Sequence, residues 1–272
     1  MTMELMIDGM DRSALDWWDD ILERLMGGSP IVFLDYDGTL TPIVEVPSKA
    51  VLSDSMRGTL HRLANYCPVA LMSSRSLTDV RSKVGLDHLI YVGSGGYEVL
   101  GPWGHYVEDR GERFKPLLDQ AEMALRYRIG DIRGALVERK RFAVAVHHRL
   151  VDPHDYPRLK TVFEDIARKF PELESIMEKR AFELRPNMDW HKGRAVNLVI
   201  DMIGIRKGAV PMYIGDDVTD EHAFRTIGEK GVTILVTEVQ RQTAAEFVLF
   251  DFQEVQELLE RLIVSLAEGR SD

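Results

Sequence analysis

The sequence holds one cysteine, Cys67, and therefore no internal disulfide. A single thiol is typical of a chain that folds in a reducing compartment. Residues 1–28 are interrupted by acidic side chains and lack the basic start and apolar centre of a signal peptide. No uninterrupted apolar stretch reaches the length of a membrane span. We therefore expect a soluble, cytoplasmic protein with no membrane partner.

An excess of positive charge is also absent. The chain has 34 basic and 44 acidic residues, and its formal net charge is −10. Such a field discourages binding to nucleic acid, so we expect no nucleic-acid partner. An anionic substrate would need a local positive site built against this background. The 272 residues, 45% of them hydrophobic, are enough for one large or two modest domains.

Short apolar strands alternate with helices in the first and the last part of the chain. A helix is expected at 13–26, and strands that end near residues 35, 73, 93, 215 and 236 are separated by amphipathic helices. This alternation predicts a doubly wound, Rossmann-like parallel sheet. The middle of the chain instead shows two charged helices and about four half-polar strands. We expect an α/β core formed by residues 1–104 and 186–272, with an inserted α+β cap at 105–185.

Polar residues follow three of the expected strands. Asp35 and Asp37 end the first strand, Ser73 begins the polar stretch that ends the second, and Asp216 follows a strand near the end of the chain. Ligands of open parallel sheets lie outside the carboxyl ends of the strands. Carboxylates from two strands that meet at this edge would hold a hard cation. Magnesium fits best, because it prefers a few carboxylates together with water and phosphate oxygens.

The spacing of Asp35 and Asp37 adds a second indication. Residues two apart in an extended strand point to the same side, so both carboxylates can face one site. This arrangement suits a nucleophile and a proton donor that flank one phosphorus atom. The alternatives to a catalytic role are a helix-capping or turn pair for Asp35 and Asp37, a surface position for Lys192, and a helix cap for Ser73.

Four motifs carry a family resemblance: “DYDGT” at 35–39, “SSR” at 73–75, Lys192 in “WHKG”, and “GDDVTD” at 215–220. In order and spacing they resemble the motifs of the haloacid dehalogenase superfamily of phosphotransferases. The resemblance implies that Asp35 is the nucleophile and forms a phospho-aspartyl intermediate. It implies that Asp37 protonates the leaving oxygen and then activates water.

The same resemblance implies the remaining roles at the strand ends. Mg²⁺ would be bound by the carboxylate of Asp35, the backbone carbonyl of Asp37, and Asp216. Ser73 and Lys192 would hold the phosphoryl oxygens, which need neutralisation during phosphoryl transfer. Asp217 and Asp220 would lie in the outer shell.

Longer segments, “VERKRFAVAVHHR” and “FELRPNMDWHKG” among them, resemble the trehalose-6-phosphate phosphatase family. In that family the inserted cap closes over the sugar. The implied substrate-binding residues are Arg75, Glu138, Lys140, Arg149 and Glu183. The chain departs from the family pattern at Ser74, Gly95, His148 and Ala181.

These departures leave several functions open. A phosphatase for trehalose 6-phosphate is expected, with action on a related phosphate of sucrose, glucosylglycerol or mannosylglycerate as the alternative. A phosphomutase and a non-catalytic subunit of a sugar-phosphate synthase are further alternatives, and association with such a synthase is an expected partnership.

Three local segments have their own interpretations. Residues 138–141 are interpreted either as a substrate contact or as a solvated charge run. The segment 93–96 is expected to be a hinge or turn toward the cap. His147 and His148 are expected on opposite faces of a strand, which argues against a zinc site there.

Overall fold

The computed structural model describes residues 12–44, 49–177, 181–205 and 207–269. The chain divides into two compact units, each described here by itself. The first, the core unit, combines Met1–His105 with His191–Asp272, and the second, the cap unit, is Tyr106–Trp190. Within the described part of the chain, no helix is long and apolar enough to cross a membrane.

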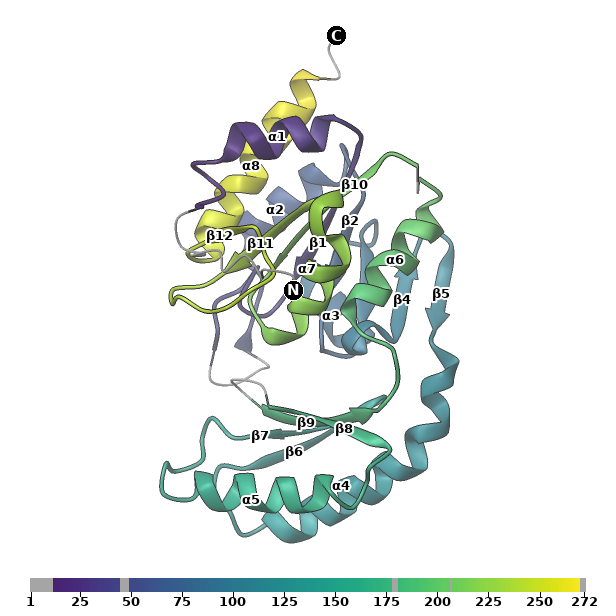
Figure 1. The fold of residues 1–272 in the computed structure, drawn as a ribbon, viewed down its shortest axis with the longest axis vertical. Helices are drawn as coiled ribbons and strands as arrows, with labels where there is room; N and C mark the ends of the chain where they lie inside the picture. The colour runs from purple at the N-terminus through teal and green to yellow at the C-terminus, as the bar shows by residue number, and fades with distance from the viewer. Residues whose placement is uncertain (1–11, 45–48, 178–180, 206, 270–272) are drawn as a thin grey trace, which may run out of the picture. The chain divides into compact units, whose positions relative to one another are not determined.

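The core unit is built on an eight-stranded sheet with the order β12-β11-β10-β1-β2-β3-β4-β5 (Figure 1). Strands β12 to β3 of this order run parallel, and β4 pairs antiparallel with β3. The strands are β1 (Ser29–Asp35), β2 (Val69–Met72), β3 (Ile90–Gly93), β4 (Glu98–Gly101), β5 (Gly104–Val107), β10 (Ala209–Gly215), β11 (Val232–Val236) and β12 (Phe247–Leu249).

Helices cover both faces of this sheet, which confirms the predicted doubly wound fold. One face packs against buried residues of α1 (Trp18–Met26), α2 (Asp54–Leu63), α3 (Leu77–Val84) and α8 (Phe252–Glu268). On the other face, Phe33 of β1 stacks on Tyr213 of β10, and Phe224 of α7 (Glu221–Ile227) meets the Tyr213 ring edge-on. Helix α6 (Lys192–Ile203) packs beside α7.

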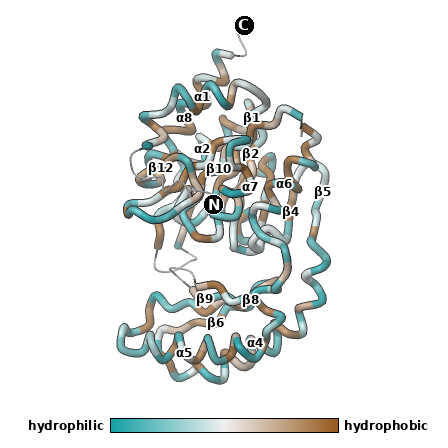
Figure 2. The backbone as a smooth tube through the Cα atoms, in the orientation of Figure 1, coloured by the Kyte–Doolittle hydropathy of each residue, from teal (hydrophilic) through white to brown (hydrophobic). Residues whose placement is uncertain are grey.

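The cap unit is a four-stranded antiparallel sheet with the order β6-β7-β9-β8. Its strands are β6 (Leu136–Lys140), β7 (Ala143–His147), β8 (Leu173–Met177) and β9 (Ala181–Pro186). Apolar residues from one face of the sheet join those of α4 (Lys115–Ile129) and α5 (Tyr156–Ala167) in one cluster. Figure 2 shows hydrophilic and hydrophobic positions alternating along both helices, as expected for helices with one buried side.

Two details differ from the sequence-based expectation. The first helix begins at Trp18 rather than at residue 13, because Ser13 pairs with Val248 in a bridge that requires extended backbone. The segment 93–96 is a short 3₁₀ turn that joins β3 to β4 within the core sheet. The expected turn is thus present, but it leads into β4 of the core sheet, and the chain stays in the core unit up to His105.

The close packing of α6 on α7 predicts an effect on stability. A Cβ atom at Gly193 would collide with the hydroxyl of Thr226 and the carbonyl of His222, whereas a Cβ at Gly58 in α2 would meet no atom within 4 Å. We expect Gly193→Ala to lower the free energy of unfolding in urea by about 1–3 kcal/mol. Gly58→Ala, the matched control on an exposed helix surface, should raise it by about 0.5–1 kcal/mol. Equal effects of the two substitutions would contradict this packing.

Candidate active site

The carboxyl ends of β1 and β10 bring the predicted acids together. The two strands are parallel neighbours, with Leu34 opposite Ile214, so Asp35 and Asp216 lie at the same edge of the sheet. Asp35, Asp216 and Asp220 are buried, and one carboxylate oxygen of each lies within 4.8 Å of the others. The clustering of Asp35 with Asp216 is the arrangement that the strand pattern predicts.

Lys192 connects two of these carboxylates. Its Nζ donates to Asp35 Oδ1 and to Asp220 Oδ1, each at 2.6 Å. The lysine is the first residue of α6, and only 4% of it is exposed. This excludes the alternative of a surface lysine. The ammonium group is placed to neutralise charge at Asp35, the position expected for the nucleophile.

Asp220 accepts four hydrogen bonds. Oδ1 accepts from Lys192 and from the hydroxyl of Tyr213, at 2.6 Å each. Oδ2 accepts from the backbone N–H groups of Asp216 and Asp217, at 3.1 and 3.0 Å. A carboxylate offers about four lone-pair sites, so these donors use the acceptor capacity of Asp220. Asp217 caps the turn 218–220 through Val218 N–H.

The electrostatics of Asp35 indicate that more positive charge is needed than Lys192 supplies. Burial raises the pKa of Asp35 well above its usual range, and the charges of Asp220 and Asp216 add to this rise, against the lowering effect of Lys192. A nucleophilic carboxylate must be ionised. A divalent cation bound by Asp35 and Asp216 would supply the missing charge, and carboxylate oxygens are suitable ligands for Mg²⁺. The donor set therefore fits the predicted metal.

Lys192 stays charged in this setting. Burial disfavours the ammonium, but the carboxylates of Asp220 and Asp35 outweigh it and hold the pKa of Lys192 well above its ordinary value. The group is thus held as a cation beside the carboxylate of Asp35.

Ser73 follows β2 and is buried, with its Oγ accepting from the backbone N–H of Arg75 at 3.1 Å. The cap of α3 is Ser76, whose Oγ accepts from Asp79 N–H, so the alternative of Ser73 as the helix cap is wrong. Backbone hydrogen bonds join the turn 93–96 to residues 73–75, which follow β2. Ser94 N–H donates to the carbonyl of Arg75 at 2.6 Å and Gly95 N–H to the carbonyl of Ser73 at 3.0 Å.

Arg75 contacts carboxylates of its own unit. It pairs with Asp37 through Nε and Nη2, and with Asp79 through Nη1. Both of these contacts are with carboxylates, and the role of Arg75 as a substrate ligand stays a prediction. Asp37, which lies just beyond the end of β1, accepts both hydrogen bonds of this bidentate pair.

Three of the predicted sugar-binding residues of the cap unit, Glu138, Lys140 and Glu183, share one face of its sheet. Val144, Val146, Phe182 and Leu184 pack against the helices, so the alternate residues of β7 and β9 point to the opposite face, which α4 and α5 do not cover and which we call the open face. Glu183 lies there and accepts from Lys140 Nζ at 2.8 Å. Glu138, directly opposite Ala145, shares this face and pairs with His147 at 2.6 Å. Arg149 follows two residues after β7.

Two of the departures from the family pattern are now placed in the cap unit. His148 lies on the helix side, where its ring packs on Phe182 at 4.6 Å and on Tyr156 at 5.1 Å between centroids. It therefore does not change the open face. Ala181 is directly opposite His147 and does lie on the open face.

Comparison with known proteins shows the family of the chain. Residues 33–252 match the family model described as trehalose-phosphatase. The chain belongs to the trehalose-phosphatase family. A relative from Oryza sativa subsp. japonica, probable trehalose-phosphate phosphatase 3, is 35% identical over 270 residues, covering 92% of this chain and 74% of its own. Trehalose-phosphate phosphatase B of Arabidopsis thaliana is 35% identical over 264 residues, covering 92% of this chain and 71% of its own.

Solved structures support the same fold. A trehalose-6-phosphate phosphatase related protein is 26% identical, with a TM-score of 0.75, covering 88% of this chain and 99% of its own. The C-terminal domain of trehalose-6-phosphate phosphatase from C. albicans has a TM-score of 0.81 at 22% identity, covering 93% of this chain and 99% of its own. The predicted family and fold are confirmed, as is the expectation of an enzyme of the phosphoric monoester hydrolase class.

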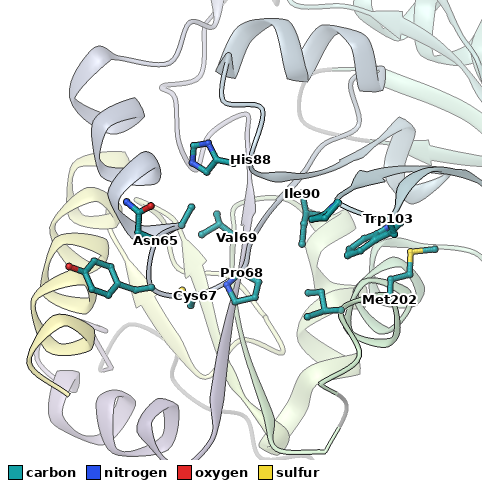
Figure 3. A pocket seen from close by; sticks show the side chains of 12 residues that line it. Asn65, Cys67, Pro68, Val69, His88, Ile90, Trp103 and Met202 are labelled. Atoms are coloured by element: carbon teal, nitrogen blue, oxygen red, sulfur yellow. The ribbon is translucent and has the colours of Figure 1, made fainter. Parts of the chain in front are cut away.

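A separate pocket of the trehalose-phosphatase chain lies away from these acids. This cavity has a volume of about 450 Å³ and is lined mainly by apolar side chains. Figure 3 shows Pro68, Ile90, Trp103 and Met202 among them. Pro68 precedes β2 and Ile90 begins β3, so the cavity lies at the amino ends of these strands. Asp35 and Ser73 follow the carboxyl ends, at the opposite edge of the sheet. The cavity is thus no part of the candidate active site.

Three residues of the site had no signal in the sequence analysis. Tyr213 binds Asp220, Asp79 binds Arg75, and His147 binds Glu138. Tyr213 lies inside an apolar strand and looks like a core residue, and Asp79 resembles an ordinary acid of a first helical turn. In the sequence, His147 stands out only as one of two adjacent histidines.

The hydrogen bond from Tyr213 to Asp220 predicts a matched pair of stability effects. Tyr213→Phe removes a buried bond to a charged acceptor and should lower the free energy of unfolding by about 1.5–3 kcal/mol. Tyr91 is equally buried, and its hydroxyl donates at the same distance of 2.6 Å to the neutral carbonyl of Leu86. Tyr91→Phe should therefore cost less, about 0.5–1.5 kcal/mol in the same urea titration. A larger loss for Tyr91→Phe would show that Asp220 does not depend on the tyrosine.

Proposed function

We propose that this enzyme hydrolyses trehalose 6-phosphate to trehalose and phosphate, with Mg²⁺ as cofactor and Asp35 as nucleophile. The observation that carries the proposal is the buried contact of Lys192 with Asp35, at the edge where Asp216 also lies. The names of the relatives supply the substrate, since two of them are called trehalose-phosphate phosphatases.

In the first half-reaction, a carboxylate oxygen of Asp35 attacks the phosphorus atom. Asp37 donates a proton to the bridging oxygen as its bond to phosphorus breaks, and trehalose leaves. Lys192 and Ser73 hold the phosphoryl oxygens, where negative charge must be balanced during transfer. Phosphate is now joined to Asp35 as an acyl phosphate.

In the second half-reaction, Asp37 accepts a proton from water as the water oxygen attacks phosphorus. The bond between phosphorus and Asp35 breaks, inorganic phosphate is released, and the Asp35 carboxylate is restored. Asp37 thus acts as acid and then as base, as a single positioned group can in a two-step displacement.

Asp35, Asp216 and the backbone carbonyl of Asp37 would hold Mg²⁺. When bound, the ion supplies positive charge that offsets the carboxylates and the phosphoryl oxygens. Asp220 stays in an outer position in this proposal, because its oxygens already accept from Lys192, Tyr213 and two backbone N–H groups.

For the cap unit, we propose that its open face binds the sugar hydroxyls. Carboxylates accept and ammonium groups donate hydrogen bonds, so Glu138, Lys140 and Glu183 form a suitable set, with Arg149 as a further donor. A cytoplasmic location and association with a sugar-phosphate synthase remain predictions. A solved domain named as a trehalose synthase regulatory protein is 13% identical, with a TM-score of 0.69 over 90% of this chain and 96% of its own, and it supports the fold alone.

Release of inorganic phosphate from a panel of sugar phosphates tests the proposed reaction. With Mg²⁺, we expect strong preference for trehalose 6-phosphate over sucrose 6-phosphate, glucosylglycerol phosphate, glucose 6-phosphate and mannose 1-phosphate. Asp35→Asn, which lacks the nucleophile, should release none, and chelation of the metal should stop a reaction that added Mg²⁺ restores.

Each other outcome points to a different function. Preference for another glycosyl phosphate would keep the chemistry and change the substrate. Isomerisation without phosphate release would indicate a mutase, and no reaction with any of these compounds would leave a non-catalytic role.

The open face of the cap unit gives a second prediction. Glu183→Gln should lower kcat/KM for trehalose 6-phosphate about 10-fold or more, because one charged hydrogen-bond acceptor is lost. Hydrolysis of p-nitrophenyl phosphate, which has no sugar, should stay unchanged. Glu122→Gln, on the helix side of the same unit and paired with Arg126, is the matched control and should alter neither. Equal losses with both substrates would count against sugar recognition by Glu183.

A further inference from the structure

Two carboxylates and an aromatic ring surround the guanidinium of Arg75. Nε and Nη2 each donate to one oxygen of Asp37 at 2.7 Å, and Nη1 donates to Asp79 Oδ2 at 2.8 Å. The ring of Tyr36 lies 5.6 Å from the guanidinium carbon. The side chain is only 12% exposed. A bidentate pair of this kind fixes both the position and the plane of a carboxylate.

The backbone of Arg75 is fixed as well. Its N–H donates to Ser73 Oγ, and its carbonyl accepts from Ser94 N–H at 2.6 Å. Gly93 lets the start of α3 lie close to the end of β3, because a Cβ at this position would lie 2.5 Å from the backbone nitrogen of Leu77. The arginine is therefore anchored at both ends, by the turn 93–96 and by its carboxylates.

Asp79 completes the arrangement from the first turn of α3. Its backbone N–H is bound by the cap residue Ser76, so the start of the helix sets its position. The contacts form a continuous series that runs from α3 through Asp79 and Arg75 to Asp37. Asp37 itself lies beyond the end of β1, where a carboxylate without such contacts would populate several rotamers.

We infer that Arg75 is a positioning residue for Asp37, held in place by Asp79, and not a direct ligand of the sugar phosphate. The inference rests on the proposed function, in which Asp37 protonates the leaving sugar oxygen. Proton transfer requires the donor within about 2.6–3.2 Å of that oxygen, which makes the orientation of the carboxylate decisive. A lysine at position 75 would keep the charge but would lose the two parallel hydrogen bonds.

The test compares two substrates that differ in their need for a proton donor. Trehalose 6-phosphate has a poor leaving group, whereas p-nitrophenolate leaves without protonation. The value of kcat/KM reports the steps up to departure of the leaving group, so the later base step does not enter. We expect Arg75→Lys to lower kcat/KM about 10-fold or more for trehalose 6-phosphate and less than about 3-fold for p-nitrophenyl phosphate. Asp79→Asn should act in the same direction with a smaller effect.

A combination with Asp37→Asn gives a second readout on trehalose 6-phosphate alone. If Arg75 acts only through Asp37, the double variant Asp37→Asn, Arg75→Lys will be no slower than Asp37→Asn. Arg81→Ala is the control, because Arg81 lies on α3 like Asp79 and pairs only with the exposed Asp87 among the described contacts. This substitution should leave kcat/KM for both substrates unchanged.

Equal losses on both substrates, together with weaker inhibition by inorganic phosphate, would overturn the inference and make Arg75 a phosphate ligand. Multiplied losses in the double variant would do the same. Absence of phosphate release by the wild type would instead remove the proposed function, and this inference with it.

Discussion

The contact of Lys192 with Asp35 and Asp220 is the interaction on which the candidate active site depends. Three carboxylates are buried at one edge of the sheet, and a buried charge is tolerated only when it is paired. Truncation of one partner of a buried pair typically costs about 3–5 kcal/mol, because the other charge is left without compensation. The lysine offsets one negative charge of the three. The uncompensated negative charge suits the site to a divalent cation, which would in turn balance the charge of a phosphoryl group.

The fold supplies this arrangement through a few close approaches. Parallel pairing of β1 with β10 places Asp35 beside Asp216, and the packing of α6 on α7 at Gly193 brings Lys192 to Asp220. Tyr213 reaches the same carboxylate from inside β10. Rigid elements thus hold every partner of the central ammonium. The second acid, Asp37, lies on a loop and is held differently, by an arginine anchored on the neighbouring loop.

Much of this organisation follows from local patterns in the sequence. Apolar strands that end in acids indicate both the doubly wound fold and the edge where the acids meet, and the two-residue period places Glu138 and Lys140 on one face. Partners far apart in the sequence follow no such pattern. Tyr213 and Asp79 acquire their roles from tertiary contacts, and β12 is defined by pairing with β11 rather than by its three residues. Periodicity also separates His147 from His148 without indicating which of them faces the helices. The packing of His148 on Phe182 decides this.

The most direct test of the central role of Asp35 is detection of its covalent intermediate. The wild-type enzyme would be mixed with trehalose 6-phosphate and Mg²⁺, quenched in acid within the first turnover, and digested for mass spectrometry. We predict one added phosphoryl group on the peptide that contains Asp35, and none when Asp35 is replaced by asparagine. A phosphoryl group on another residue, or release of phosphate with no labelled peptide at any quench time, would contradict the assignment of Asp35 as the nucleophile.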